Sequence, residues 1–237
     1  MQTSYEKDLK ELDQIIEVAS ILFSELNTNS KIASYQLMMG LFASVIEQTK
    51  SFSALLNNKL FSSTQAIARN VLELYIDIKN VEKDGNYSNY LWAEYFDREK
   101  ELAKTKEKQK KYRKERDKSF SLYKQGEAYK ILNIHEKFKL ADMKDEYQTV
   151  YTKLSANTHS GVLLLMNRIF RHDKEQTQIG QGLFKTEPSM VERYTVPLVS
   201  YYLLDTCEII AKGHDEEALK IVQEFRYYLL NKSKITS

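Results

Sequence analysis

The chain has 237 residues, of which 42% are hydrophobic and 29% are charged. This balance is typical of a folded globular protein and excludes a disordered one. The 35 Lys and Arg residues nearly match the 33 Asp and Glu residues, so net charge alone predicts neither a nucleic-acid nor a membrane partner. Only two prolines and seven glycines are present, which indicates long helices joined by few loops.

The expected compartment follows from the single cysteine and the lack of long apolar runs. Cys207 has no second cysteine with which to form an internal disulfide, as is usual in a reducing compartment. The first residues are charged and show no signal-peptide pattern. No apolar stretch approaches the roughly 18 residues that a membrane span needs. We therefore expect a cytoplasmic protein with no membrane partner.

Three helices are expected at residues 5–26, 32–52 and 65–81. Apolar residues of the first recur at alternating spacings of four and three, a heptad-like stripe that we expect to pack on the next helix. The second is apolar on nearly every face, which predicts a central helix. The third is apolar except for one narrow polar strip, formed by Arg69, Glu73, Asp77 and Asn80.

Residues 97–118 differ sharply from the rest, because 17 of these 22 residues are charged. They are good helix formers with acid and base pairs three or four residues apart. We expect them to continue the helix that begins near Ser88. One helix over 88–118 would be about 45 Å long, so part of it would project into solvent or run between subunits.

The remaining segments are also expected to be mostly helical. They comprise a short helix over 128–134, a helix opened by Asp142, an apolar run after His159, a long polar loop at 171–189, and helices over 190–212 and after Gly213. The fold class is therefore all-α, a multi-helix bundle with a long charged helical arm in mid-chain. We expect an N-terminal half (1–96), the arm (97–118) and a C-terminal half (119–237) that packs with the first into one domain.

No metal site is expected from the four histidines, His135, His159, His172 and His214. None follows a Glu, Asp, His or Cys by three or four residues, as di-metal bundles and zinc proteases require. The lone Gly180-x-Gly182 has neither a preceding strand nor a following lysine motif, so it does not predict a phosphate loop. We expect no cofactor.

A polar pocket is expected where two helical faces meet. Arg69 with Glu73, and Ser155 with His159, each have the i, i+4 spacing that places two side chains on one face. If the faces meet, Glu73 would orient the imidazole and Arg69 would offer a positive charge to a phosphate or carboxylate. Such a pocket suits anion recognition or general acid–base cleavage of RNA. The alternative is a hydrogen-bond network that only joins two helices.

A second candidate is a basic stripe along the charged segment. The segment carries eleven positive and six negative charges, and a lysine row on one helical face is a plausible phosphate-binding surface. The alternative is a solvated helix with internal salt bridges. The stripe comprises Lys100, Lys104, Lys108, Lys111, Lys114 and Lys118.

Two short motifs carry a family resemblance. Arg69-Asn-Val-Leu-Glu73 and the downstream Tyr151-Thr-Lys-Leu-Ser-Ala-Asn-Thr-His159 resemble an uncharacterised bacterial family, the domain of unknown function 5677. The resemblance spans roughly residues 32–170 and implies an all-helical fold. It also implies that Arg69, Glu73, Ser155 and His159 belong to one site.

More distantly, the chain is similar to helical HEPN-type proteins, many of which are dimeric ribonucleases of bacterial toxin and antiphage systems. Their signature is an Arg, four to six intervening residues and a His, whereas Arg168 and His172 are separated by three. This resemblance implies a homodimer and adds Arg168 and His172 to the candidate site residues.

Three functions remain open from the sequence. The first is a protein that binds an anionic ligand or a partner through the Arg69, Glu73, Ser155 and His159 pocket, in a defence or stress system. The second is a metal-independent endoribonuclease. The third is a structural subunit that binds a protein partner through the first helix and the charged arm.

Overall fold

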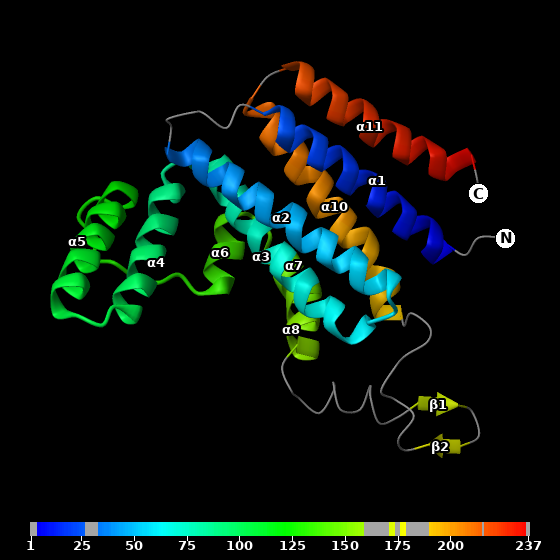
Figure 1. Cartoon of the computed structure of the whole chain (residues 1–237), viewed down its shortest axis with the longest axis horizontal. Helices are drawn as coiled ribbons and strands as arrows, with labels where there is room; N and C mark the ends of the chain where they lie inside the picture. The colour runs from blue at the N-terminus through cyan, green and yellow to red at the C-terminus, as the bar shows by residue number, and fades with distance from the viewer. Residues whose placement is uncertain are drawn as a thin grey trace. The chain divides into compact units, whose positions relative to one another are not determined.

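The computed structural model of the protein describes residues 4–26, 33–158, 171–173, 176–178, 190–214 and 216–235 (Figure 1). The first half contains helices α1 (Ser4–Glu25), α2 (Ala33–Asn57), the 3₁₀ turn η1 (Phe61–Ser63), α3 (Thr64–Lys83), α4 (Tyr87–Leu102) and α5 (Lys106–Tyr123). The second half contains α6 (Ile134–Leu140), α7 (Lys144–Glu146), the π-helical turn η2 (Tyr147–Tyr151), α8 (Thr152–Thr158), β1 (Arg171–Asp173), β2 (Gln176–Gln178), α10 (Met190–Lys212) and α11 (Glu216–Ile235).

The all-α class is confirmed, since nearly every described element is a helix. The exception is a short antiparallel pair of strands, β1 and β2, with Arg171 opposite Gln178; it lies in the segment predicted to be a polar loop. Among the described residues, no helix combines the length and apolar character needed to cross a membrane.

The helices form two compact units that interleave along the chain. Unit 1 comprises Met1–Leu26, Leu41–Tyr75 and Asp145–Ser237, and unit 2 comprises Asn27–Gly40 and Ile76–Lys144. Helices α2 and α3 each begin in one unit and end in the other. Each unit therefore contains residues from both predicted halves of the chain.

The core of unit 1 is built by α1, α10 and the unit 1 parts of α2 and α3. Leu12 of α1, Phe42 of α2, Leu72 of α3 and Leu203 of α10 are all fully buried. The apolar stripe of α1 packs along α10 as well as touching α2 (Figure 1). The sequence predicted only the next helix as its partner, because a one-dimensional stripe does not identify which distant helix will cover it.

In unit 2, α4 and α5 run antiparallel as a helical hairpin (Figure 1), so the expected continuous helix over 88–118 is wrong. Ala103 is extended, and the hydroxyl oxygen of Thr105 accepts a hydrogen bond from the backbone N–H of Lys108, which caps the start of α5. The reversal lets the Tyr112 ring stack on Phe96 at 6.4 Å. It also buries Phe120, which a single projecting helix would leave in solvent.

The predicted helix over 128–134 is also wrong, because residues 127–133 have no regular secondary structure and a helix begins only at Ile134. Asn133 and Glu136 form a capping box at that start. Within this irregular stretch, Tyr129 and Leu132 pack against the core of unit 2, and the Leu132 backbone N–H donates to the Tyr90 hydroxyl at 3.0 Å. Tertiary packing therefore overrides the helical pattern here.

Candidate functional site

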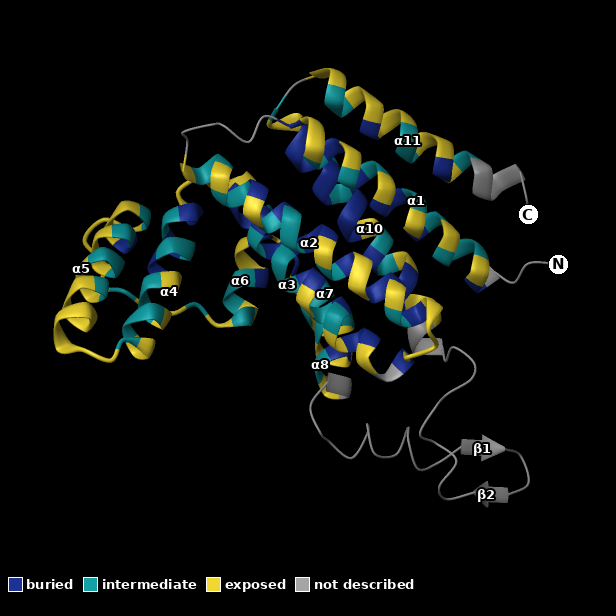
Figure 2. Ribbon diagram, viewed as in Figure 1, coloured by how far each residue is buried: buried dark blue, intermediate teal, exposed yellow. Residues whose placement is uncertain are grey.

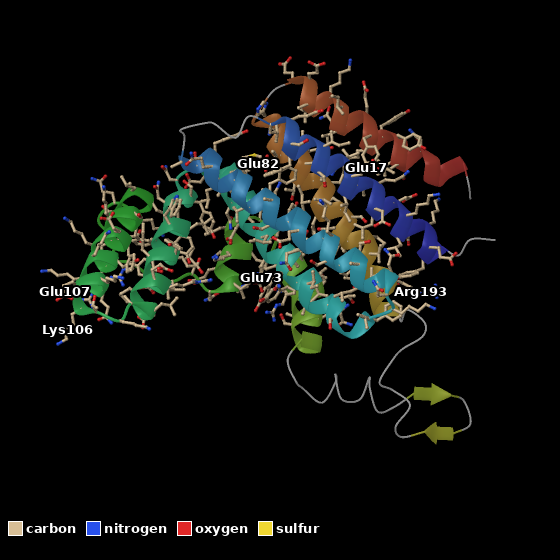
Figure 3. All side chains as sticks on the ribbon, viewed as in Figure 1. Glu17, Glu73, Glu82, Lys106, Glu107 and Arg193 are labelled. Carbon is tan, nitrogen blue, oxygen red and sulfur yellow. The ribbon has the colours of Figure 1, made fainter. Side chains whose placement is uncertain are left out.

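The polar strip predicted on the third helix lies on α3, and its first two members form an ion pair. Arg69 Nε and Glu73 Oε1 are 3.2 Å apart, one helical turn from each other, and their side chains are 24% and 37% exposed (Figure 3 labels Glu73). These exposures place both charges at the boundary between core and solvent. Both residues belong to unit 1.

The second element of this site is the π-helical turn η2 and the helix α8 that follows it. The hydroxyl of Tyr151 donates to the same Glu73 oxygen at 2.9 Å, and the Tyr151 ring stacks on Tyr147 at 5.6 Å between centroids. A π-helical turn is uncommon and is often found at functional sites, because it redirects the side chains within one turn. The contact joins residues that are 78 positions apart in the chain.

Burial raises the pKa of the Tyr151 phenol, and the Glu73 carboxylate raises it further. The neighbouring Ser155 hydroxyl and the Arg69 guanidinium act in the opposite direction. The phenol therefore stays protonated near neutral pH and acts as a hydrogen-bond donor. We call Arg69, Glu73, Tyr151 and Ser155 the Arg69 cluster.

The structure thus brings together three of the four residues predicted for the pocket: Arg69, Glu73 and Ser155. The fourth, His159, lies outside the described residues. Tyr151 belongs to the cluster but was not predicted as a site residue. Its position one turn before Ser155, inside the same short motif, was the signal that could have identified it.

The other two members of the strip, Asp77 and Asn80, belong to unit 2 and face a largely buried lysine. Lys137 Nζ lies 3.3 Å from an Asp77 oxygen and 3.0 Å from a Glu94 oxygen. The Tyr87 hydroxyl donates to Asp77 at 2.8 Å, and the Asn80 amide donates to the backbone carbonyl of Lys137 at 3.0 Å. We call Asp77, Tyr87, Glu94 and Lys137 the Lys137 network.

The charges of the Lys137 network are nearly withdrawn from solvent. Burial raises the pKa of Asp77, an effect that Lys137 and the Tyr87 hydroxyl only partly oppose. Burial alone would lower the pKa of Lys137, but the two carboxylates beside it raise it overall. For Glu94, burial is outweighed by Lys137 and Arg98, so its pKa is lowered. The lysine therefore stays charged between two acids, as a structural ion network would require.

The predicted lysine stripe is divided by the reversal between α4 and α5. Lys100 lies in α4 and pairs with Asp97 and Glu101 at 2.7 and 3.0 Å. Lys104 lies in the connection, whereas Lys108, Lys111, Lys114 and Lys118 lie on α5 and are exposed. The six side chains therefore do not share one helical face. A role in nucleic-acid binding for this set stays a prediction.

The remaining candidates are described only in part. Arg168 lies outside the described residues, and His172 is described as a residue of strand β1 without its side chain. Cys207 is buried in α10, and burial raises the pKa of its thiol. A thiol in this environment packs as a small apolar side chain. Within the described part of the chain, no three His, Cys, Asp or Glu residues gather as a metal site would need.

Comparison with known proteins places the region that contains the Arg69 cluster within a family. Searches of curated proteins and of solved structures each found no match to the chain. A family model, described as a family of unknown function, matches residues 35–176, which is more than half of the chain and includes both motifs of the Arg69 cluster. The protein therefore belongs to the family of unknown function DUF5677.

Proposed function

We propose that the protein binds a small phosphate-bearing ligand at the Arg69 cluster. The observation that carries this proposal is the hydrogen bond of 2.9 Å from Tyr151 to Glu73, which joins the two motifs of the family-matched region. It brings the Arg69 guanidinium and the Tyr151 and Ser155 hydroxyl groups together at the boundary between core and solvent.

Each side chain of the cluster would have a definite role in binding. One Glu73 oxygen lies 3.2 Å from Arg69 Nε and accepts a hydrogen bond from the Tyr151 hydroxyl, so the carboxylate holds both side chains in place. Arginine is suited to phosphate because its planar guanidinium presents several N–H donors in a fixed geometry. Ser155 lies beside Tyr151 with its hydroxyl oxygen buried, so it would position the phenol.

Recognition is favoured over acid–base chemistry by the groups that the structure describes. The Tyr151 phenol has a raised pKa, which makes it a donor and not a base at neutral pH. Acid–base cleavage of RNA would depend on His159, which lies outside the described residues. Operation as a cytoplasmic homodimer in a defence or stress system stays a prediction.

The test is calorimetric titration of the whole protein with inorganic phosphate and, separately, with a nucleoside monophosphate. Arg69→Gln should weaken binding of either probe at least about tenfold, since a charge-assisted hydrogen bond contributes about 1.5–3 kcal/mol. The matched control is Arg98→Gln, because Arg98 forms the same kind of one-turn ion pair with Glu94 at 2.8 Å in unit 2. It should bind as the wild type does.

Two further measurements complete the test. Tyr151→Phe should weaken binding several-fold while leaving the circular dichroism spectrum unchanged. Metal-free RNA cleavage by the wild type that is lost in His159→Ala would instead support the endoribonuclease. A wild type that binds neither probe, or an Arg69→Gln variant with unchanged affinity, would refute the proposal.

A further inference from the structure

Helix α5 presents a row of four lysines on the side that faces away from the core of unit 2. Many residues of α5 are exposed (Figure 2). Among them, Lys106, Lys110, Lys114 and Lys118 are all exposed and follow each other at i, i+4 spacing, so they share one face of the helix. With a rise of about 6 Å per step, the row is roughly 18 Å long. We call these residues the α5 lysine row.

The acidic side chains of the hairpin are mostly engaged elsewhere. Arg116 pairs with Asp97 of α4 at 2.9 Å and with Asp117 at 2.6 Å, and Lys100 pairs with Asp97 and Glu101. In the part of the chain that the structure describes, none of the four row lysines lies within ion-pair distance of a carboxylate. Asp97 therefore neutralises charge along the contact between α4 and α5, and the outer face keeps an excess of positive charge.

Two acidic residues, Asp117 and Glu107, interrupt this face. Asp117 is exposed, falls between Lys106 and Lys110 around the helix axis, and pairs with Arg116 at 2.6 Å. Glu107 is exposed beside Lys106, at the outer edge of the α4–α5 pair (Figure 3). At 100° per residue, it falls between Lys114 and Lys118 around the helix axis. It lowers the positive potential at the start of the row without pairing with a row lysine.

We propose that the α5 lysine row binds the phosphate backbone of a nucleic acid. A duplex carries one phosphate charge per about 1.7 Å of its axis, so a row of this length would face roughly ten charges. Four lysines at regular intervals can neutralise several of them without reading the base sequence. This row differs from the stripe predicted from sequence, shares only Lys114 and Lys118 with it, and does not depend on the function proposed for the Arg69 cluster.

The chemistry of the face favours nucleic acid over a membrane or a protein. A helix that lies on a membrane inserts a face of apolar side chains. In α5, Tyr112 stacks on Phe96 and Phe120 is buried, and a single exposed leucine, Leu122 in the last turn, does not form such a face. A stable protein interface needs aromatic or aliphatic anchors at its centre. No such anchor lies between the row lysines.

The experiment measures anisotropy of labelled duplex DNA and of labelled single-stranded RNA between about 50 and 200 mM salt. The row variant carries Lys106→Gln, Lys110→Gln, Lys114→Gln and Lys118→Gln. The control variant carries Lys10→Gln, Lys50→Gln, Lys144→Gln and Lys220→Gln, which are also exposed. Both variants lose four positive charges, so they have the same net charge. Glutamine is a good helix former, so α5 should persist, as circular dichroism would verify.

For duplex DNA, the logarithm of the binding constant should fall with the logarithm of salt concentration with a slope of about −3.6 for four phosphate contacts. The row variant should bind at least about tenfold more weakly, with a slope near zero. The control variant should stay within about twofold of the wild type. RNA should show a shallower slope if it is the partner, because single strands release fewer counterions.

A variant that is expected to bind nucleic acid more tightly provides an independent test of the proposal. Glu107→Gln removes one of the two acids of the face, so it should tighten binding about two- to threefold at low salt. A wild type that does not bind, a salt-independent affinity, or an equal loss in the row and control variants would overturn the proposal. So would binding of phosphatidylserine vesicles by the wild type without binding of either nucleic acid.

Discussion

The Lys137 network and the Arg69 cluster start from the same polar strip of α3, yet they differ in how far solvent reaches their charges. In the network, the side chains of Lys137, Asp77 and Glu94 are 12%, 16% and 17% exposed. In the cluster, Arg69 and Glu73 are 24% and 37% exposed. A charge that is withdrawn from solvent is stable only when an opposite charge pairs with it. A partly exposed charge can still contact a ligand from solution. The comparison separates a structural use of the strip from the binding use proposed for the cluster.

The largest effect is expected from Lys137→Met. The substitution would leave Asp77 and Glu94 buried without their shared cation, so the free energy of unfolding should fall by about 3–5 kcal/mol. Urea denaturation followed by circular dichroism would measure it. Lys83→Met is the control, because Lys83 pairs with Asp142 where both are more than half exposed, and should cost less than about 1 kcal/mol. Equal losses in the two variants would remove the distinction between buried and exposed pairs.

Glu94→Gln should cost about 2 kcal/mol at pH 7, and this loss should depend on pH. The pKa of Glu94 is lowered in the folded state from 4.5, chiefly because Lys137 and Arg98 outweigh burial. Its stabilising contribution is therefore fully present above pH 4.5 and is lost as pH falls through the folded pKa. Denaturation at neutral pH and in acid should show the variant and the wild type converging in acid. A constant difference would show that Glu94 acts through packing alone.

A matched pair of hydroxyl deletions compares the two sites directly. Tyr87→Phe removes the donor to buried Asp77, and Tyr151→Phe removes the donor to half-exposed Glu73. The first should cost about 2 kcal/mol because a buried carboxylate loses a partner, and the second about 0.5–1 kcal/mol because water can replace the hydroxyl. Thermal unfolding of both variants in one buffer is the measurement. If Tyr151→Phe lost more stability than Tyr87→Phe, the Arg69 cluster would be the structural element.

The smallest stability effect is expected from Arg69→Gln. A one-turn ion pair at this exposure contributes little, so unfolding free energy should change by less than about 1 kcal/mol. The same variant should lose phosphate binding, as proposed above. A loss of several kcal/mol in chemical denaturation would instead identify Arg69 as part of a network that holds α3 against η2 and α8.

Helices with a strong apolar period were predictable from sequence, and reversals of direction were less so. The prediction of a helix over 190–212 matches α10, which spans Met190–Lys212. The turn at Ala103–Thr105 was missed because the residues on both sides are good helix formers. The helix ends there because Thr105 caps the start of α5 and because contacts across the hairpin stabilise the reversal. One of them joins Arg116 to Asp97, 19 residues apart. Such distant contacts leave no local signal.

The sequence by itself determined that α3 is a helix with one polar strip, since side chains three and four residues apart must share a face. It also indicated, through two short motifs, that Arg69, Glu73 and Ser155 belong together. Only the tertiary structure decided that Tyr151 joins them and that Asp77 and Asn80 meet Lys137. Helical periodicity is a property of neighbouring residues, whereas a partner 57 to 78 positions away is selected by how the whole chain packs and by the requirement that buried charges be matched.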